Sequence, residues 1–152
     1  MLVKEIMKTA VVSILHGTPF SEVAKTLLEK RVSGAPVVDE NNKLIGVVSE
    51  KDLFKAIYPT YNDFYTSPEL YTDFTKMEKD AEDVKNKKVE ECMSARLITA
   101  TPETPVLKIG ALMVATGIHR VPVVEGEKLV GMISRGDVYR SILREHFGLW
   151  EV

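Results

Sequence analysis

Two neighbouring side chains in residues 118–124, which read IHRVPVV, are able to handle a charged group. The Arg120 guanidinium can donate paired hydrogen bonds to a phosphate. The His119 imidazole can donate a hydrogen bond, bind a metal or move a proton. The same pair can also simply end a helix, where a cation interacts favourably with the helix dipole. The residue types alone therefore leave phosphate binding, metal binding, proton transfer and helix termination open.

A serine followed three residues later by an aspartate occurs twice. Ser49 precedes Asp52, and Ser134 precedes Asp137. This spacing is typical of a capping box at a helix start. A carboxylate there can also accept both hydroxyls of a ribose, and the free amides of a helix N-terminus can hold a phosphate. Capping and ligand binding are compatible, because a cap need not use every lone pair.

The rest of the chain offers little for catalysis or for a metal. The three histidines lie far apart at positions 16, 119 and 146, and Cys92 is the single cysteine. Nothing resembles a nucleophile elbow, a Walker loop or a metal triad. We therefore expect no enzymatic activity, no catalytic residue, no metal site and no cofactor.

Composition narrows the class of protein. The chain has 152 residues, enough for a compact domain with a core, and a net charge of -2 with a pI near 6.0. This charge argues against a general nucleic-acid binder, and no apolar run approaches the roughly 18–20 residues that span a bilayer. One cysteine and no hydrophobic N-terminal signal favour a reducing, cytoplasmic setting.

The chain also repeats itself. When residue 3 is set on residue 89, VKEIM falls on VEECM and the Thr-Pro pairs coincide. APVVD then falls on VPVVE, and, after one residue is dropped in a turn, KLIGVVSEKD falls on KLVGMISRGD. Repetition at this level predicts two copies of one supersecondary unit.

Each copy predicts the same series of elements. Thr18-Pro19 and Thr104-Pro105 predict helix N-caps with proline at the first helical position. The apolar positions that follow at helical spacing are Phe20, Val23, Ala24, Leu27 and Leu28, then Val106, Ile109, Gly110, Met113 and Val114. The β-type runs are 11–14, 36–39 and 44–49, then 97–100, 122–125 and 129–134. Second helices start near Lys51 and Gly136, so the unit is β-α-β-β-α with a hairpin, an α/β (α+β) fold present twice.

A segment without a counterpart separates the copies. Most tyrosines and phenylalanines lie in residues 54–74, and Ser67-Pro68 predicts a helix start. The apolar positions that follow are Leu70, Phe74, Met77, Ala81 and Val84. Their spacing of four and three predicts a narrow apolar seam on a charged helix. The seam either packs back on its own domain or forms a face for a dimer or another partner.

These motifs resemble the CBS domain family. The resemblance rests on P-V-V before a turn, followed by G-h-h-S-x-x-D (h apolar) before a helix, and it covers residues 1–58 and 89–147. The chain is similar to a stand-alone tandem CBS pair, or Bateman module. The resemblance implies a first repeat at 1–58, a helical insertion at 59–88 and a second repeat with a C-terminal tail at 89–152. It further implies pseudo-symmetric repeats packed sheet to sheet, and a homodimer.

The resemblance also implies two nucleotide sites, each combining the Ser-x-x-Asp motif of one repeat with the turn of the other. The first site combines Ser49 and Asp52 with Ile98, Ile118, His119, Arg120 and Pro122. The second combines Ser134, Arg135 and Asp137 with Val12, Val32, Ser33, Gly34, Ala35 and Pro36. In this scheme the aspartates bind ribose and the apolar positions enclose adenine.

The turn at 118–122 is similar to one in the gamma subunit of AMP-activated protein kinase, in which the histidine and arginine face phosphates. The first copy departs from that pattern, because Ser33 and Gly34 replace the cationic pair. The resemblance implies that the phosphates of both sites point toward the same region, so His119 and Arg120 could serve either site, and whether the two sites bind phosphate equally stays open.

The function that the resemblance implies is a regulatory module. It would sense an adenosine-containing ligand, namely AMP, ADP, ATP or S-adenosylmethionine, and pass the signal to a regulated protein. We expect no membrane partner and no nucleic-acid partner. The alternative is a structural dimerisation or protein-interaction module without a nucleotide ligand.

Overall fold

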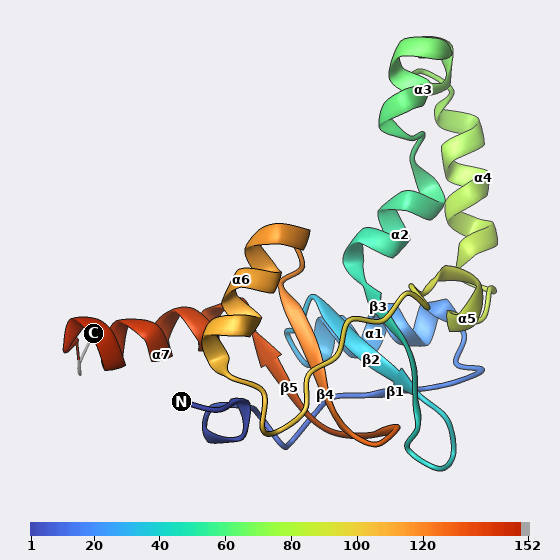
Figure 1. The fold of residues 1–152 in the computed structure, drawn as a ribbon. Helices are drawn as coiled ribbons and strands as arrows, with labels where there is room; N and C mark the ends of the chain where they lie inside the picture. The colour runs from blue at the N-terminus through green and yellow to red at the C-terminus, as the bar shows by residue number, and fades with distance from the viewer. Residues whose placement is uncertain (150–152) are drawn as a thin grey trace. The chain divides into compact units, whose positions relative to one another are not determined.

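The computed structural model describes residues 1–149, which form two compact units (Figure 1). Unit 1 contains Met1–Val11, Asn41–Leu44 and the chain from Ile98 onward. Unit 2 contains Val12–Glu40 and Ile45–Leu97. Among residues 1–149 no helix has the length and apolar character needed to cross a membrane.

Unit 2 is built on a three-stranded sheet in the order β1-β2-β3, with β1 parallel to β2. Its core elements are β1 (Ile14–Leu15), α1 (Phe20–Glu29), β2 (Gly34–Val38), β3 (Leu44–Ser49), α2 (Glu50–Ile57) and α5 (Val89–Cys92). β2 is buried along its whole length, whereas β3 alternates between buried and half-buried residues. Helix α1 buries Phe20, Val23 and Leu27, at the helical spacing that predicted it.

Unit 1 is built on an antiparallel hairpin with a register irregularity between Val123 and Val124. Its elements are the 3-10 helix η1 (Val3–Glu5), α6 (Val106–Thr116), β4 (Arg120–Glu125), β5 (Lys128–Ser134) and α7 (Arg135–Phe147). The hairpin, the first helix and the second helix of this copy are confirmed. The predicted strand at 97–100 is wrong, because Ala100 forms only an isolated parallel bridge with Val123.

Other predicted boundaries also shift. The prolines, not the threonines, are the N-caps: Pro19 precedes α1 and Pro105 precedes α6, both with extended backbone. The Thr18 hydroxyl instead donates to the Leu15 carbonyl at 2.5 Å, which closes the preceding turn. In the first copy the predicted strand at 11–14 begins only at Ile14. The observed N-cap thus lies one residue after the predicted one, a difference that is common at helix ends.

The N-terminal segments of the two sequence repeats are exchanged between the units. Val3 belongs to the core cluster of unit 1, with the second repeat's helix and hairpin, and Val89 belongs to that of unit 2. Each exchanged segment sets a methionine against a strand glycine. A Cβ added to Gly131 would lie 2.7 Å from the Met7 sulfur, and one added to Gly46 would collide with the Met93 sulfur. The sequence repeats and the compact units therefore divide the chain differently.

The insertion forms an arm on unit 2, defined here as α3 (Tyr61–Thr66), η2 (Pro68–Tyr71) and α4 (Phe74–Val84) (Figure 1). Ser67-Pro68 does start a helix, but it is the short 3-10 helix η2, and α4 has its own cap from Asp73, which accepts from the Lys76 amide at 3.0 Å. Helix α4 packs against α2. The seam positions Leu70, Met77, Ala81 and Val84 are half-buried or buried, whereas Phe74 is 68% exposed. The seam thus packs largely within its own unit.

Candidate functional site

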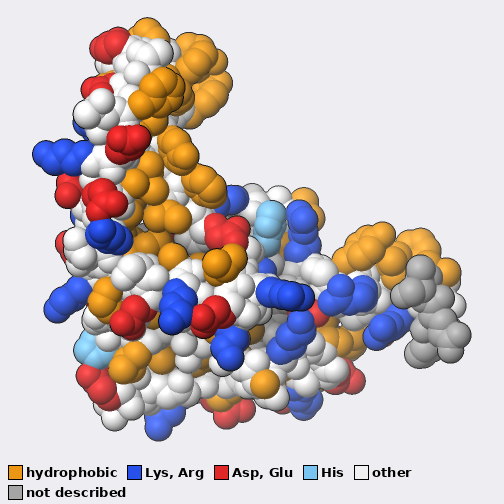
Figure 2. Space-filling view, turned by 180° about the vertical axis from the view of Figure 1, so that it is seen from behind, with side chains coloured by type: hydrophobic (Ala, Val, Ile, Leu, Met, Phe, Trp, Pro, Cys, Tyr) orange, Lys and Arg blue, Asp and Glu red, His pale blue; other side chains and the backbone are white. Residues whose placement is uncertain are grey.

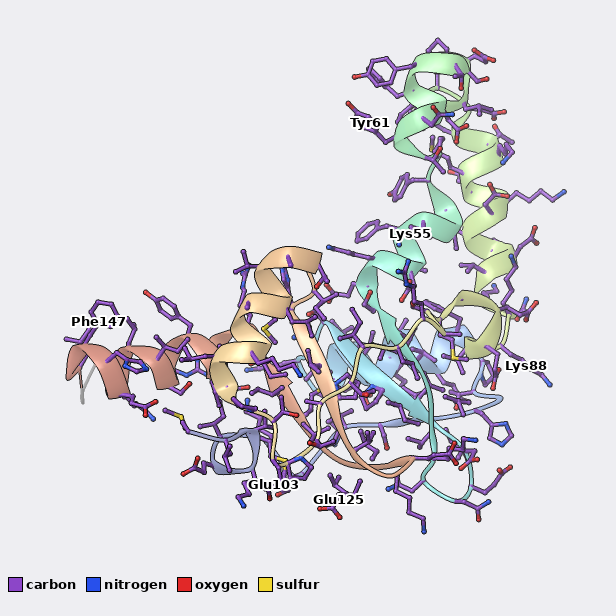
Figure 3. All side chains as sticks on the ribbon, viewed as in Figure 1. Lys55, Tyr61, Lys88, Glu103, Glu125 and Phe147 are labelled. Carbon is purple, nitrogen blue, oxygen red and sulfur yellow. The ribbon has the colours of Figure 1, made fainter. Side chains whose placement is uncertain are left out.

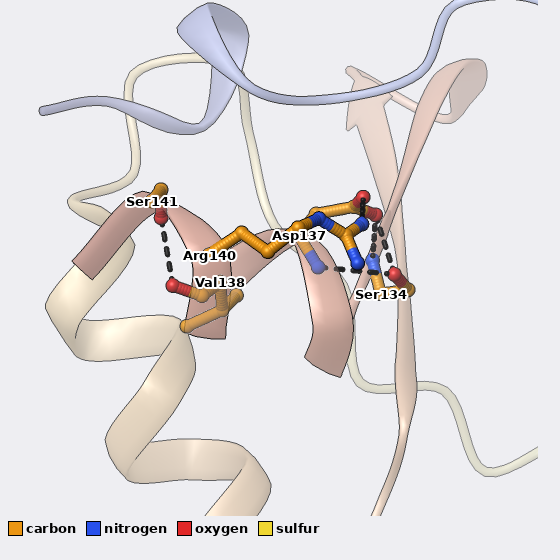
Figure 4. A network of polar contacts seen from close by, with 5 residues as sticks. All are labelled: Ser134, Asp137, Val138, Arg140 and Ser141. Carbon is orange, nitrogen blue, oxygen red and sulfur yellow. Dashed lines mark hydrogen bonds and ion pairs between the residues drawn. The ribbon is translucent and has the colours of Figure 1, made fainter. Parts of the chain in front are cut away.

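Both Ser-x-x-Asp motifs form capping boxes at helix starts. At α7, the Ser134 amide donates to Asp137 Oδ2 at 2.9 Å, and the Asp137 amide donates to Ser134 Oγ at 3.3 Å (Figure 4). At α2, the Ser49 amide and hydroxyl donate to Asp52 Oδ2 at 2.6 and 3.3 Å. These bonds satisfy amides that the first helical turn leaves without partners. The predicted caps are confirmed at both positions.

The two aspartates differ in their second oxygen. Asp137 Oδ1 accepts from the Arg140 guanidinium at 2.7 Å, so both of its oxygens are engaged (Figure 4). Within the described part of the chain, the hydrogen bonds of Asp52 all use Oδ2. The Asp52 carboxylate therefore keeps one oxygen for another hydroxyl group.

The environments of the two carboxylates differ as well. Asp137 is 8% exposed, whereas Asp52 is half-buried. Burial alone would raise the pKa of Asp137, but hydrogen bonds from Ser134 and the charges of Lys8 and Arg140 outweigh it and hold that pKa below its usual value. Asp137 is thus a stably ionised structural anion.

In unit 1 the cationic turn lies against the cap of α7. The Arg135 amide donates to the His119 carbonyl at 2.8 Å, and Arg135 Nη1 lies 3.3 Å from His119 Nε2. Arg120 begins β4 directly opposite Ser134 on β5. His119 and Arg135 therefore lie side by side next to the Ser134 cap, and Arg120 lies on the strand position opposite Ser134.

In unit 2 the corresponding turn makes the same backbone contact with different side chains. The Glu50 amide donates to the Ser33 carbonyl at 3.0 Å. A Cβ added to Gly34 would lie 3.0 Å from the Val48 carbonyl oxygen and 3.3 Å from Ser49 Cβ, so the backbone approaches too closely for a side chain. Where unit 1 has two arginines and a histidine, unit 2 has Gly34, Glu50 and Ser33.

The remaining predicted residues are buried to different degrees. Ala35 and Pro36 are buried in β2, and Pro122 is buried in β4. Val12, Val32, Ile98 and Ile118 are half-buried. Proline cannot donate a backbone hydrogen bond and has a fixed φ, so Pro36 and Pro122 restrict the path of their strands.

The structure thus brings together the turn and the cap of the same unit. The predicted sites instead join the cap of one repeat to the turn of the other, and that combination stays a prediction. Sequence reasoning missed Arg140 and Glu50. Arg140 had a signal, because it follows Asp137 at the three-residue spacing of helical ion pairs, and Glu50 is the residue that aligns with Arg135.

A cavity of about 230 Å³ lies in unit 2 between α2 and the arm, and neither Ser49 nor Asp52 lines it. Its lining includes Lys55, Tyr58, Asp63, Leu70 and Met77. Acidic and basic side chains are mixed along it, so the cavity does not favour one ligand charge. The turns, and not this cavity, carry the chemistry predicted from the sequence.

Known relatives cover nearly the whole chain. The uncharacterized protein MJ1426 of Methanocaldococcus jannaschii is 33% identical over 94% of this chain and 92% of its own length. The chloroplastic CBS domain-containing protein CBSX2 of Arabidopsis thaliana is 30% identical, but the match spans 56% of its length. A homoserine O-acetyltransferase of Methanohalobium evestigatum is 26% identical, and the match spans 24% of it. The same kind of segment therefore also occurs within longer proteins.

Solved structures share the fold. CBSX2 from Arabidopsis thaliana, crystallised in complex with AMP, is 26% identical with a TM-score of 0.73, covering 94% of this chain and 96% of that chain. The CBS domain pair of MJ0100, in complex with 5′-methylthioadenosine and S-adenosyl-L-methionine, is also 26% identical, with a TM-score of 0.69 and coverage of 93% and 95%.

The family model described as CBS domain matches twice, at residues 3–59 and 89–144. These two matches take in both turns and both Ser-x-x-Asp caps, and they leave out the whole arm. With the repeated hairpins, the capped helices and the shared fold, they show that the chain belongs to the CBS domain family and carries two CBS repeats.

Proposed function

We propose that the chain is a regulatory module that binds an adenosine-containing ligand such as AMP, ADP, ATP or S-adenosylmethionine. The observation that carries this proposal is the placement, in both units, of a Ser-Asp helix cap beside a turn, joined by a backbone hydrogen bond. Such a cap offers a carboxylate to a ribose and helix amides to a phosphate. Related CBS pairs crystallised with AMP, and with 5′-methylthioadenosine and S-adenosyl-L-methionine, support the ligand class.

The two proposed sites differ in ligand preference. The site with Asp52 would receive His119 and Arg120, and Asp52 has an oxygen available for the ribose. The site with Asp137 would receive Ser33 and Gly34, and Asp137 Oδ1 is already engaged by Arg140. We therefore assign phosphorylated nucleotides to the Asp52 site.

Regulation would follow from differential binding. A ligand that contacts both repeats favours the arrangement of the chain that it binds more tightly, and a regulated protein reads the change. A ligand with equal affinity for both arrangements would switch nothing. The module would act as a homodimer in the cytoplasm, a setting that its single cysteine favours.

Calorimetric titration with AMP, ADP, ATP, S-adenosylmethionine and adenosine tests this function. We expect Arg120→Ala to weaken AMP binding about tenfold while changing adenosine binding little, because only AMP carries a phosphate. Lys108→Ala, which removes an exposed cation from α6, is the matched control and should bind as the wild type does. Equal losses for AMP and adenosine would contradict the phosphate role.

A second candidate function, a structural interaction module without a nucleotide, is favoured by the exposed aromatic side chains of the arm. It predicts no heat of binding for any of these ligands up to about 1 mM, which corresponds to about 4 kcal/mol of binding free energy. Detection of any adenosyl ligand below that concentration would decide for the sensor.

A further inference from the structure

The cavity between α2 and the arm is built entirely within unit 2. All of its lining residues fall within residues 55–80, from the last turn of α2 to the middle of α4, and α4 packs against α2. Figure 3 labels Lys55 on α2 and Tyr61 at the start of the arm. The cavity volume of about 230 Å³ is below the roughly 300–1,000 Å³ of sites that enclose drug-sized ligands. The cavity therefore suits a molecule of the size of a free amino acid rather than a whole nucleotide.

Half-buried apolar side chains form one part of the lining. They are Ile57 from α2, Pro59 from the segment after it, Leu70 from η2 and Met77 from α4. Figure 2 shows hydrophobic side chains running along the arm, with acidic and basic side chains beside them. Such a lining buries an apolar group of a ligand, while a few polar groups fix the orientation of the ligand.

Three carboxylates line the cavity from the arm, and within the described part of the chain each is hydrogen-bonded through one oxygen. Asp63 Oδ2 accepts from the amide and the hydroxyl of Thr60, both at 2.7 Å. Asp73 Oδ1 accepts from the Lys76 amide at 3.0 Å. Asp80 Oδ2 accepts from the Lys76 ammonium at 2.9 Å. The second oxygen of each carboxylate can therefore accept from a ligand.

One lysine interacts with all three carboxylates. The hydrogen bond to Asp80, together with the charge of that carboxylate, raises the pKa of Lys76. The charges of Asp73 and Asp63 act in the same direction. Hydrogen bonds from Thr60 lower the pKa of Asp63, and the charge of Lys76 adds to that effect. Because three anions share one cation, the arm side of the cavity keeps a net negative charge.

The α2 side of the cavity carries the opposite charge. Lys55 lies in the last turn of α2, is exposed and is the charged residue that this helix contributes to the lining. Within residues 1–149 its ammonium forms neither a hydrogen bond nor an ion pair. The cavity thus has an available cation on one wall and available carboxylate oxygens on the other.

We propose that this cavity binds a zwitterion, namely a free α-amino acid with an apolar side chain. The ammonium group of the ligand meets the unused oxygens of Asp63 and Asp73, and its carboxylate meets Lys55. Its side chain packs on the apolar part of the lining, which includes Leu70 and Met77. A ligand with one charge leaves one wall unpaired, whereas a zwitterion complements both walls. This inference does not rest on the proposed nucleotide function, because the lining contains no residue of either turn or of either Ser-x-x-Asp motif.

Calorimetric titration of the full chain with L-leucine and L-methionine tests the proposal. We expect saturable binding with a dissociation constant at or below about 1 mM. Isopentylamine lacks the carboxylate of L-leucine and 4-methyl-2-oxopentanoate lacks its ammonium group, so each should bind about tenfold more weakly. Equal binding of either analogue shows a site for one charge and overturns the proposal. Absence of saturable binding by both amino acids also overturns it.

Charge variants test the assignment of each wall. Lys55→Met should weaken L-leucine binding about tenfold and leave isopentylamine binding unchanged. The double variant Asp63→Asn with Asp73→Asn keeps an oxygen for each helix cap, and it should weaken L-leucine binding about tenfold without changing that of 4-methyl-2-oxopentanoate. The matched controls are Lys79→Met and Asp83→Asn, which change exposed residues of α4 outside the lining and should bind as the wild type does. Controls that weaken binding as much as the lining variants contradict the proposal.

A variant that fills the cavity tests the position of the ligand without changing any charge. Ala56 is half-buried on α2 and lines the cavity, and leucine is also a good helix former. Ala56→Leu should therefore keep the fold, which circular dichroism verifies, and weaken L-leucine binding at least tenfold. A folded Ala56→Leu protein that binds L-leucine as the wild type does would place the ligand elsewhere and overturn the proposal.

Discussion

The regions formed by the turn and the helix cap have the same backbone hydrogen bond in both units but differ in the charge of their side chains. In each, the amide after the cap serine donates to the carbonyl of the turn, at 2.8 Å in unit 1 and 3.0 Å in unit 2. Around that common hydrogen bond, unit 1 places His119, Arg120 and Arg135, and unit 2 places uncharged or acidic residues. The two copies therefore have the same backbone arrangement at this position and different side-chain charges around it.

The cap aspartates show the same divergence in their hydrogen bonds. Asp137 is buried and bound by Ser134 and Arg140, so its main role is to hold the start of α7. Asp52 is half-buried and bonded through one oxygen. The more exposed aspartate and the cationic turn belong to the same predicted site, so we predict that this site binds a phosphorylated nucleotide more tightly than the other.

The largest effect on stability is expected when the arginine of the unit 1 turn, Arg120, is introduced at the corresponding position of unit 2, Gly34. Gly34→Arg should lower the free energy of unfolding by about 3 kcal/mol, because even a Cβ there approaches the Val48 carbonyl and Ser49. The reverse change, Arg120→Gly, should cost only about 1 kcal/mol, the usual penalty for glycine in a strand. Urea unfolding of both variants measures the difference. A Gly34→Arg protein as stable as the wild type would mean that the two turns are interchangeable.

Replacement of each cap aspartate by alanine should show that Asp137 contributes more to the stability of the fold than Asp52 does. Asp137→Ala should lower the free energy of unfolding by about 2 kcal/mol, since it leaves the Ser134 donors and Arg140 without their partner. Asp52→Ala should cost about 1 kcal/mol, the typical value for a helix cap. Thermal and urea unfolding give both values, and equal losses would show that the extra contacts of Asp137 add nothing.

The lowered pKa of Asp137 predicts a pH dependence of stability. A carboxyl group whose folded pKa lies below its unfolded value near 3.8 stabilises the fold fully above that value. This contribution is lost as the pH falls from there through the lower folded pKa. Asp137→Asn should therefore flatten the acid limb of the stability curve, as followed by unfolding at a series of acidic pH values. An unchanged acid limb would contradict the role of Ser134 and the nearby cations.

The smallest expected effect concerns the Asp137 site itself. Arg140→Leu frees Asp137 Oδ1, so the carboxylate regains an oxygen for a ribose. Adenosine affinity at this site should rise a few-fold, by less than about 1 kcal/mol. Calorimetry on a background of Asp52→Asn isolates the site. A loss of affinity would indicate that Arg140 itself contacts the ligand.

Much of the fold could be predicted from the sequence because it is local and repeated. The hairpins follow from β-type runs around short turns, and the starts of α2 and α7 follow from Ser49 and Ser134 at the capping spacing. The two copies support each other, since the same apolar phase appears in α1 and α6. For the same reason the cap residues of the candidate site could be named in advance.

The rest depends on tertiary contacts that a pattern does not contain. Val3 and Val89 look like residues of their own repeats, and nothing local shows that their segments are exchanged between the cores. The ion pair of Asp137 with Arg140 had a signal in its three-residue spacing, but that spacing alone does not show which charges on a helix are paired. The strand predicted at 97–100 failed because a β-type composition forms a strand only where a partner runs along it.

AMP titration of two matched variants, Asp52→Asn and Asp137→Asn, tests the central comparison most directly. Asparagine keeps the size of the side chain and an oxygen for the cap, so each variant removes mainly the charge. The account predicts that Asp52→Asn weakens AMP binding about tenfold or more and that Asp137→Asn changes it little. Equal weakening in both variants, or a loss confined to Asp137→Asn, would contradict the assignment of the phosphorylated ligand to Asp52 and the cationic turn.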